Sequence, residues 1–116
     1  MSKEHKSEEE ITRDAVYEGR LTILQPRNGY RFSIDSYLLI WFASQGRTAT
    51  LSADFGAGCG VVGIGLLAAG VTRRVVAVEV QSDLARLAVR NAALNDLQAA
   101  HRVLFADVRT APQELE

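Results

Sequence analysis

The stretch Asp54-Phe55-Gly56-Ala57-Gly58-Cys59-Gly60 constrains the fold of this chain more than any other, because a carboxylate is followed there by glycines at every second position. An apolar, β-prone run precedes the stretch, and an apolar segment, Val61 to Ala69, follows it. This order predicts a strand over 49–55, a tight turn and a helix over 61–69. Glycine adopts positive φ without steric cost, and the unpaired N–H groups at the start of the helix point into the same turn. We therefore expect a nucleotide-like ligand to lie over the turn.

Two classes of ligand fit these glycines. Gly58, Gly60 and Gly63 have the spacing of a dinucleotide-binding turn, and Glu79 follows at about the ~20 residues expected of a ribose-binding acid. Asp54 favours a different ligand, because a fixed negative charge beside the turn attracts an ammonium group and repels a pyrophosphate. S-adenosylmethionine (SAM) carries an ammonium group and a sulfonium and has no phosphate. The sequence therefore favours SAM over a dinucleotide.

Strands and helices alternate after the glycine turn. Further strands are expected over 75–80 and 102–106, with a helix over 83–95 that Ser82 caps. The alternation predicts an α/β fold whose parallel sheet has the neighbouring order 3-2-1 and right-handed crossovers. In a doubly wound sheet the first strand is central, so we expect this chain to form the first half of such a sheet. The unpaired edge of the first strand predicts a missing C-terminal half or a marginally stable chain that self-associates.

An acidic residue stands at the end of each expected strand of this sheet. Asp54 ends the first strand, Glu79 lies at the end of the second, and Asp107 follows the third. Ligands of such sheets bind beyond the carboxyl ends of the strands. We expect Asp54 to face the ammonium group of SAM, Glu79 to accept from both ribose hydroxyls, and Asp107 to accept from the adenine amino group.

The residues before the glycine turn divide into two regions. Residues 1–13 are charged and lack hydrophobic periodicity, which predicts a disordered tail. Residues 14–46 predict a small antiparallel meander of three short β-prone runs, followed by a helix that Ser33 or Asp35 can cap. This helix is apolar on most sides, so we expect it to be buried. The remaining residues, 47–116, are expected to be a SAM-binding, Rossmann-like half-domain.

Composition excludes several classes of function. The net charge is −1, from 13 cationic and 14 acidic residues, and gives no electrostatic support for nucleic-acid binding. No apolar run approaches the roughly 20 residues that span a bilayer, so we expect a cytoplasmic protein without membrane contact. Cys59 is the sole cysteine and is expected to be a small apolar residue of the turn. His5 and His101 are isolated, and we expect both to be solvated and no metal to be bound.

Three segments together carry a resemblance to a known family. They are Gln25-Pro26-Arg27-Asn28-Gly29-Tyr30-Arg31-Phe32-Ser33-Ile34-Asp35-Ser36, Glu79-Val80-Gln81 and Arg90-Asn91-Ala92-Ala93-Leu94-Asn95. With the glycine motif, they resemble the SAM-dependent methyltransferases that modify adenine N6 in valine tRNA, over about residues 16 to 109. The resemblance implies a Rossmann-like class I methyltransferase fold, SAM as methyl donor, an adenine of tRNA as acceptor, and a segment around Phe32, Ser33 and Asp35 that helps close the SAM pocket. The cofactor-binding residues that we expect are Ser33, Asp35, Asp54, Phe55, Gly56, Ala57, Gly58, Gly60, Glu79, Val80 and Asp107.

The sequence departs from this family in one respect. Such enzymes carry an Asn-Pro-Pro-aromatic motif that holds the target amino group and stacks on the flipped base. That motif does not occur in this sequence, in which Pro26 and Pro112 are the only prolines. We therefore expect no catalytic residue in this chain. In the parent enzyme we expect direct in-line methyl transfer that depends on positioning.

Other functions stay open. A methyltransferase that acts on a protein glutamine or on another RNA base would share every motif described above. A non-catalytic module that binds SAM or RNA is an alternative from a different class. A dehydrogenase is disfavoured by Asp54 and by the long segment that precedes the first strand of the sheet.

Overall fold

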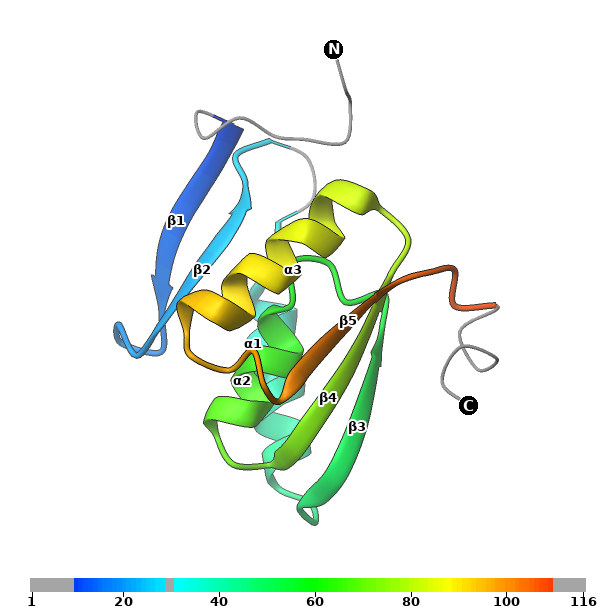
Figure 1. The fold of residues 1–116 in the computed structure, drawn as a ribbon. Coiled ribbons are helices and arrows are strands. Elements are labelled where there is room, and N and C mark those ends of the chain that lie inside the picture. The colour runs from blue at the N-terminus through cyan, green and yellow to red at the C-terminus, as the bar shows by residue number, and fades with distance from the viewer. Residues whose placement is uncertain (1–9, 29–30, 110–116) are drawn as a thin grey trace.

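The structure is a computed structural model that describes residues 10–28 and 31–109 (Figure 1). The helices and strands in these ranges are β1 (Ile11–Val16), β2 (Leu21–Pro26), α1 (Ile34–Ser44), β3 (Ala49–Phe55), α2 (Val61–Ala68), β4 (Thr72–Glu79), α3 (Ser82–Leu94) and β5 (His101–Phe105).

A parallel sheet organises the second part of the chain. Its strands lie in the order β3-β4-β5, which confirms the order expected from the sequence. The central strand β4 is buried at every position from Val75 to Glu79, as its unbroken apolar run predicts for a strand covered by neighbours on both edges. The carboxyl ends of all three strands lie at the same end of the sheet, next to the turn between β3 and α2.

The helices lie on one side of this sheet in Figure 1, and β3 and β5 are its two edge strands. α2 and α3 are the crossover helices between successive parallel strands, and α1 packs against α2. The two helices approach each other closely: a Cβ atom added at Gly65 would lie only 2.5 Å from Cδ1 of Ile40. Glycine at position 65 therefore permits the approach of the two helices.

The N-terminal segment forms an antiparallel hairpin of β1 and β2 that packs against α3. Its turn contains Tyr17, Glu18 and Gly19, all of which have positive φ. Buried side chains of the hairpin, α2 and α3 share one core, in which Ile23, Ile64 and Leu87 are at most 2 % exposed. The hairpin is therefore packed into the sheet-and-helix unit and is not a separate domain.

The structure corrects the expected N-terminal boundaries. β1 begins at Ile11, so residues 11–13 belong to a strand and not to the expected tail, while residues 1–9 lie outside the described part of the chain. The expected meander is a hairpin of two strands over the described residues, because Arg31 and Phe32 are not in a strand. Hydrogen bonds with side chains, and not pairing with a third strand, hold the chain at Arg31 and Phe32.

The expected burial of α1 is wrong. Only Ile40 of this helix is buried, whereas the exposed fractions of Ile34, Trp41 and Phe42 are 71 %, 61 % and 71 %. An apolar sequence shows that a helix has surface to bury, but it does not show that the rest of the described chain covers that surface.

Three smaller expectations also change. His101 is 5 % exposed and not solvated, because it is the first residue of β5 and faces α2 next to Gly63. The strand itself begins one residue earlier than expected. Ser82 is the first residue of α3, and the capping position is taken by Gln81 without a side-chain hydrogen bond. Within the described ranges, no helix is long and apolar enough to cross a membrane.

Candidate functional site

The loop between β3 and α2 requires glycine at three positions. Gly56, Gly58 and Gly60 have φ values of +74°, +60° and +91°, in the region where a Cβ atom causes strain. A Cβ atom at Gly60 would also lie 3.3 Å from Cβ of Ala88 on α3. Gly60 is the N-cap of α2 and supplies no side-chain cap to the first turn of that helix. The pattern of alternate glycines therefore sets the path of this loop, here called the glycine loop (residues 56–60).

Glu79, the last residue of β4, holds the glycine loop. Its side chain is buried, with Oε1 accepting the N–H of Gly58 at 2.7 Å and Oε2 accepting the N–H of Gln81 at 2.9 Å. Each carboxylate oxygen has a second lone pair, so both hydrogen bonds leave capacity for further donors. Glu79 thus has a structural role, and its free lone pairs can still accept ribose hydroxyls.

Asp54 lies at the end of β3, directly before the glycine loop. Its Oδ2 atom is buried and has no hydrogen-bond partner among the described residues. Burial raises the pKa of this carboxyl group, a hydrogen bond from the Gly63 backbone opposes the rise, and the nearby charge of Glu79 adds to it. A buried acceptor without a donor costs free energy, so a cationic donor that reaches this atom would be bound favourably.

Asp107 follows β5 and is bound by a neighbouring arginine. Its Oδ2 atom lies 2.7 Å from Nη2 of Arg109, and Oδ1 accepts the Nε–H and the backbone N–H of the same residue. These side-chain and backbone hydrogen bonds lower the pKa of Asp107 to about 2. An adenine amino group that binds Asp107 would have to share the carboxylate with Arg109 or displace it.

The other expected site residues fall into two groups. Phe55 is the last residue of β3 and Val80 follows β4, and they are 54 % and 57 % exposed, so they offer apolar surface beside the acids. The N–H groups of Gly56 and Ala57 both donate to the carbonyl of Val78, which joins the loop to β4.

Ser33 and Asp35 form the other group and lie at the start of α1. Ser33 is the N-cap of this helix, and its Oγ atom accepts the N–H of Asp35 at 3.2 Å. No hydrogen bond that the structure gives for the described residues joins either side chain to the glycine loop. The structure therefore joins Glu79 to the loop by a hydrogen bond and places Asp54 just before the loop, while it gives no such link for Ser33 and Asp35.

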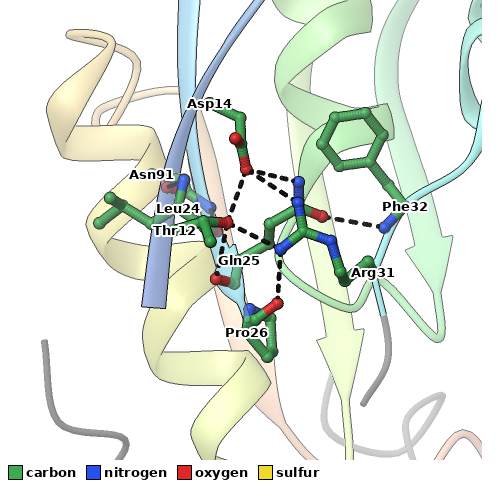
Figure 2. A network of polar contacts seen from close by, with 8 residues as sticks. All are labelled: Thr12, Asp14, Leu24, Gln25, Pro26, Arg31, Phe32 and Asn91. Atoms are coloured by element: carbon green, nitrogen blue, oxygen red, sulfur yellow. Dashed lines mark hydrogen bonds and ion pairs between the residues drawn. The ribbon is translucent and has the colours of Figure 1, made fainter. Parts of the chain in front are cut away.

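A polar network around Arg31 was not expected from the sequence (Figure 2). The Nη1 atom of Arg31 donates to Oγ1 of Thr12 at 2.7 Å and to the carbonyl of Pro26 at 2.8 Å, and Nη2 pairs with Asp14 at 3.2 Å. Gln25, which is 3 % exposed, accepts the N–H of Phe32 and donates to Asp14. The network thereby fixes the segment that leads into α1. A lone glutamine in an apolar strand was the available signal.

This network lowers the pKa of Asp14. Burial would raise this pKa, but hydrogen bonds from Gln25 and Thr12 and the charge of Arg31 together lower it. The carboxylate is therefore ionised at neutral pH and keeps its donors in place.

Asn91 is a second residue whose contact with the site was missed. It lies on the buried face of α3, is fully buried, and donates from Nδ2 to the carbonyl of Cys59 in the glycine loop at 2.8 Å. The signal was an amide within the apolar stripe of this helix. Cys59 itself is buried as a small apolar residue, as expected, and burial raises the pKa of its thiol to about 11.

Within the described residues, no group of three or more His, Cys, Asp or Glu side chains could hold a metal ion.

Comparisons with known proteins give the fold. No protein-family model matches the sequence, and no curated protein is similar enough to count as a match. Among solved structures, M. jannaschii TYW2 in complex with AdoMet matches 90 % of this chain with a TM-score of 0.73 at 21 % identity, and the match covers 47 % of that protein. P. horikoshii TYW2 in complex with MeSAdo matches 90 % of this chain and 39 % of its own, with a TM-score of 0.72 at 20 % identity.

A third structure has a stated activity. The M. jannaschii tRNA m1G37 methyltransferase matches 86 % of this chain and 31 % of its own length, with a TM-score of 0.70 at 17 % identity. The chain thus spans less than half of the length of each of these three proteins. It has the Rossmann-like α/β fold that its sequence predicts, and shares that fold with all three.

Proposed function

We propose that this chain is the SAM-binding part of a methyltransferase that acts on tRNA. The observation that carries the proposal is the buried Oδ2 atom of Asp54, which has no donor within the described chain and lies at the start of the glycine loop. The ammonium group of SAM supplies a charged donor of the kind that this atom lacks. A dinucleotide would instead bring a pyrophosphate toward the same carboxylate.

The remaining contacts follow from the positions of the other acids. Glu79 keeps lone pairs for the ribose hydroxyls after its two backbone hydrogen bonds. Asp107, at the end of the neighbouring strand, is the acceptor that we assign to the adenine amino group. Phe55 and Val80 provide apolar surface next to them. When bound, SAM supplies an activated methyl group. This chain's residues bind and orient the methyl donor.

The tRNA substrate is the finer part of the proposal. Two observations support it: the resemblance of three sequence segments to the enzymes that modify adenine N6 in valine tRNA, and the structural match to a tRNA methyltransferase. That structure is a tRNA m1G37 methyltransferase, so the match supports tRNA as a substrate class more than it supports adenine N6. Another RNA base or a protein glutamine remains the alternative acceptor.

Calorimetric titration of the chain with SAM tests the proposal, with NADH as the competing ligand. We expect SAM to bind and NADH not to bind. Asp54→Ala should weaken SAM binding by about tenfold or more, because a charge-assisted hydrogen bond is lost. Glu18→Ala removes the same charge from the exposed turn of the hairpin and should leave SAM binding unchanged. Binding of NADH in preference to SAM, or equal SAM affinity of Asp54→Ala and the unchanged chain, would contradict the proposed site.

A further inference from the structure

The side chain of Asn91 joins the glycine loop to the N-terminal hairpin. Asn91 lies in the C-terminal part of α3 and is fully buried, and Figure 2 shows it beside Leu24 of β2. Its Oδ1 atom accepts the N–H of Leu24 at 2.7 Å, and Nδ2 donates to the carbonyls of Leu24 and Cys59 at 2.9 and 2.8 Å. Both amide hydrogens are therefore used, one on the hairpin and one on the glycine loop.

The contact with Cys59 holds the loop at its centre. Cys59 lies between Gly58 and Gly60. Both glycines have positive φ, a backbone conformation that residues with a side chain rarely adopt. Because a peptide unit is planar, a fixed Cys59 carbonyl also fixes the Gly60 N–H, which donates to the Ala57 carbonyl at 3.0 Å. On the other side, Glu79 accepts the Gly58 N–H. Two peptide groups of the loop, with one peptide group between them, are thus held from α3 and from β4.

Asn95, one helical turn later, repeats only half of this arrangement. Its Oδ1 atom accepts the N–H of Thr22 at 2.9 Å, and Nδ2 donates to the Thr22 carbonyl at 2.8 Å and to the Asn91 carbonyl at 2.8 Å. Its hydrogen bonds in the described chain do not reach the glycine loop. The two asparagines therefore fasten the hairpin to α3 in the same way, and Asn91 alone extends to the loop.

We infer that Asn91 is a positioning residue for the cofactor, which sets the shape of the glycine loop through the carbonyl of Cys59. Asn91 is buried beneath the loop and acts through its hydrogen bond to the Cys59 carbonyl. This inference rests on the proposed function, because the loop is the surface on which SAM is proposed to bind. Asn95 has the separate and purely structural role of holding the hairpin.

Paired variants separate the two roles. Asn91→Ala and Asn95→Ala each remove an amide that bonds to β2, and both should lower the melting temperature. Only Asn91→Ala should weaken SAM binding, by about tenfold in calorimetry well below the melting temperature, while Asn95→Ala should bind within twofold of the unchanged chain. Equal weakening by both variants, or unchanged SAM affinity of folded Asn91→Ala, would overturn the inference.

A second readout does not depend on SAM. Amide hydrogen exchange at Gly58 and Gly60 should become faster in Asn91→Ala and stay unchanged in Asn95→Ala. If the unchanged chain does not bind SAM, the proposed function fails, while the exchange rates still decide whether Asn91 holds the loop. Should Asn91→Ala not fold, Asn91→Ser replaces it, because its shorter side chain leaves room for a water at Leu24 and cannot span the distance to Cys59. Unchanged loop exchange in Asn91→Ser would overturn the inference.

Discussion

At the scale of single residues, the three acids of the candidate site differ in how far their hydrogen-bonding capacity is used. Glu79 accepts a backbone N–H on each oxygen, and Asp107 is held by Arg109. Asp54 has a buried oxygen with no partner among the described residues. The acids look equivalent in the sequence, but of the three only Asp54 has a buried oxygen that accepts no hydrogen bond from the described residues. We therefore expect Asp54, of the three acids, to contribute most to the binding of a positively charged ligand group.

Asp54→Asn should make the chain more stable at neutral pH and less able to bind SAM. The pKa of Asp54 is raised in the folded state, so the free energy of unfolding that this group contributes is lost as the pH rises through its folded pKa. Removing the charge removes that loss, and the difference in stability should vanish at a pH below the unfolded pKa of 3.8. Urea unfolding at several pH values measures this effect. Lower stability of Asp54→Asn at pH 7 would contradict it.

His101 should make the chain less stable in acid. The ring is 5 % exposed, neither ring nitrogen has a hydrogen-bond partner among the described residues, and burial lowers the pKa below 6.5. The unfolded chain then binds a proton that the folded chain does not, so stability is full above about pH 6.5 and falls as the pH decreases toward the folded pKa. His101→Leu should flatten this part of the pH profile in thermal melts. Arg102→Gln, at the exposed neighbouring position, should leave the profile unchanged.

At the scale of elements, the glycine loop depends on backbone conformation and on close packing with α3. Gly60→Ala should lower the free energy of unfolding by about 2–3 kcal/mol, because a side chain at positive φ is strained and the new Cβ would lie 3.3 Å from Ala88. Gly70→Ala is the matched control, since its φ is also positive but no atom lies within 4 Å of the added Cβ. It should cost about 1 kcal/mol. Equal losses in urea unfolding would show that packing against α3 contributes nothing.

The elements themselves could be predicted largely from the sequence. β3 has the expected bounds and α2 begins at the expected residue, because a period-two apolar run, a glycine turn and an apolar helix are each local signals. The hairpin was harder to predict, since its two strands are short and its turn has positive φ at Tyr17 and Glu18, where glycine would be usual. Because the hairpin was hard to predict, the start of β1 at Ile11 was also missed.

The environment of the site could be predicted only in part. The spacing of Asp54, Glu79 and Asp107 placed each acid at a strand end, because strand ends are local features. The Gly58 N–H as a partner of Glu79 was not predictable, since it depends on a tertiary contact, whereas Arg109 is a local partner that lies two residues from Asp107. The burial of α1 was wrong for a related reason: hydrophobicity is a property of the helix, whereas its cover depends on the rest of the fold.

At the scale of the whole molecule, α1 and β3 are among the elements that expose large apolar side chains. On α1 these residues include Trp41 and Phe42, and on β3 they are Leu51 and Phe55, which are 58 % and 54 % exposed. β3 pairs only with β4 in the described sheet, so its outer edge carries unpaired backbone groups. Exposed apolar side chains beside an open strand edge favour association with another polypeptide.

We therefore expect this chain to self-associate at micromolar concentration. Sedimentation velocity over a range of concentrations should show species larger than the 12.7 kDa monomer. Leu51→Lys, which places a charge on the exposed face of β3, should shift the distribution toward monomer. Arg73→Lys, an exposed position on β4 that keeps its charge, should not. A monomeric chain with a cooperative melt at these concentrations would contradict the expectation.

The outer edge of β2 differs from that of β3. The side-chain amides of Asn91 and Asn95 take both backbone groups of Leu24 and Thr22, so they occupy the positions that the peptide groups of a neighbouring strand would fill. A further strand therefore cannot pair with the hairpin on that side, although the described part of the chain has no strand there. Two asparagines one turn apart on a helix can thus act as a surrogate strand, which seals the β2 margin of the hairpin while the β3 margin stays open to templated growth.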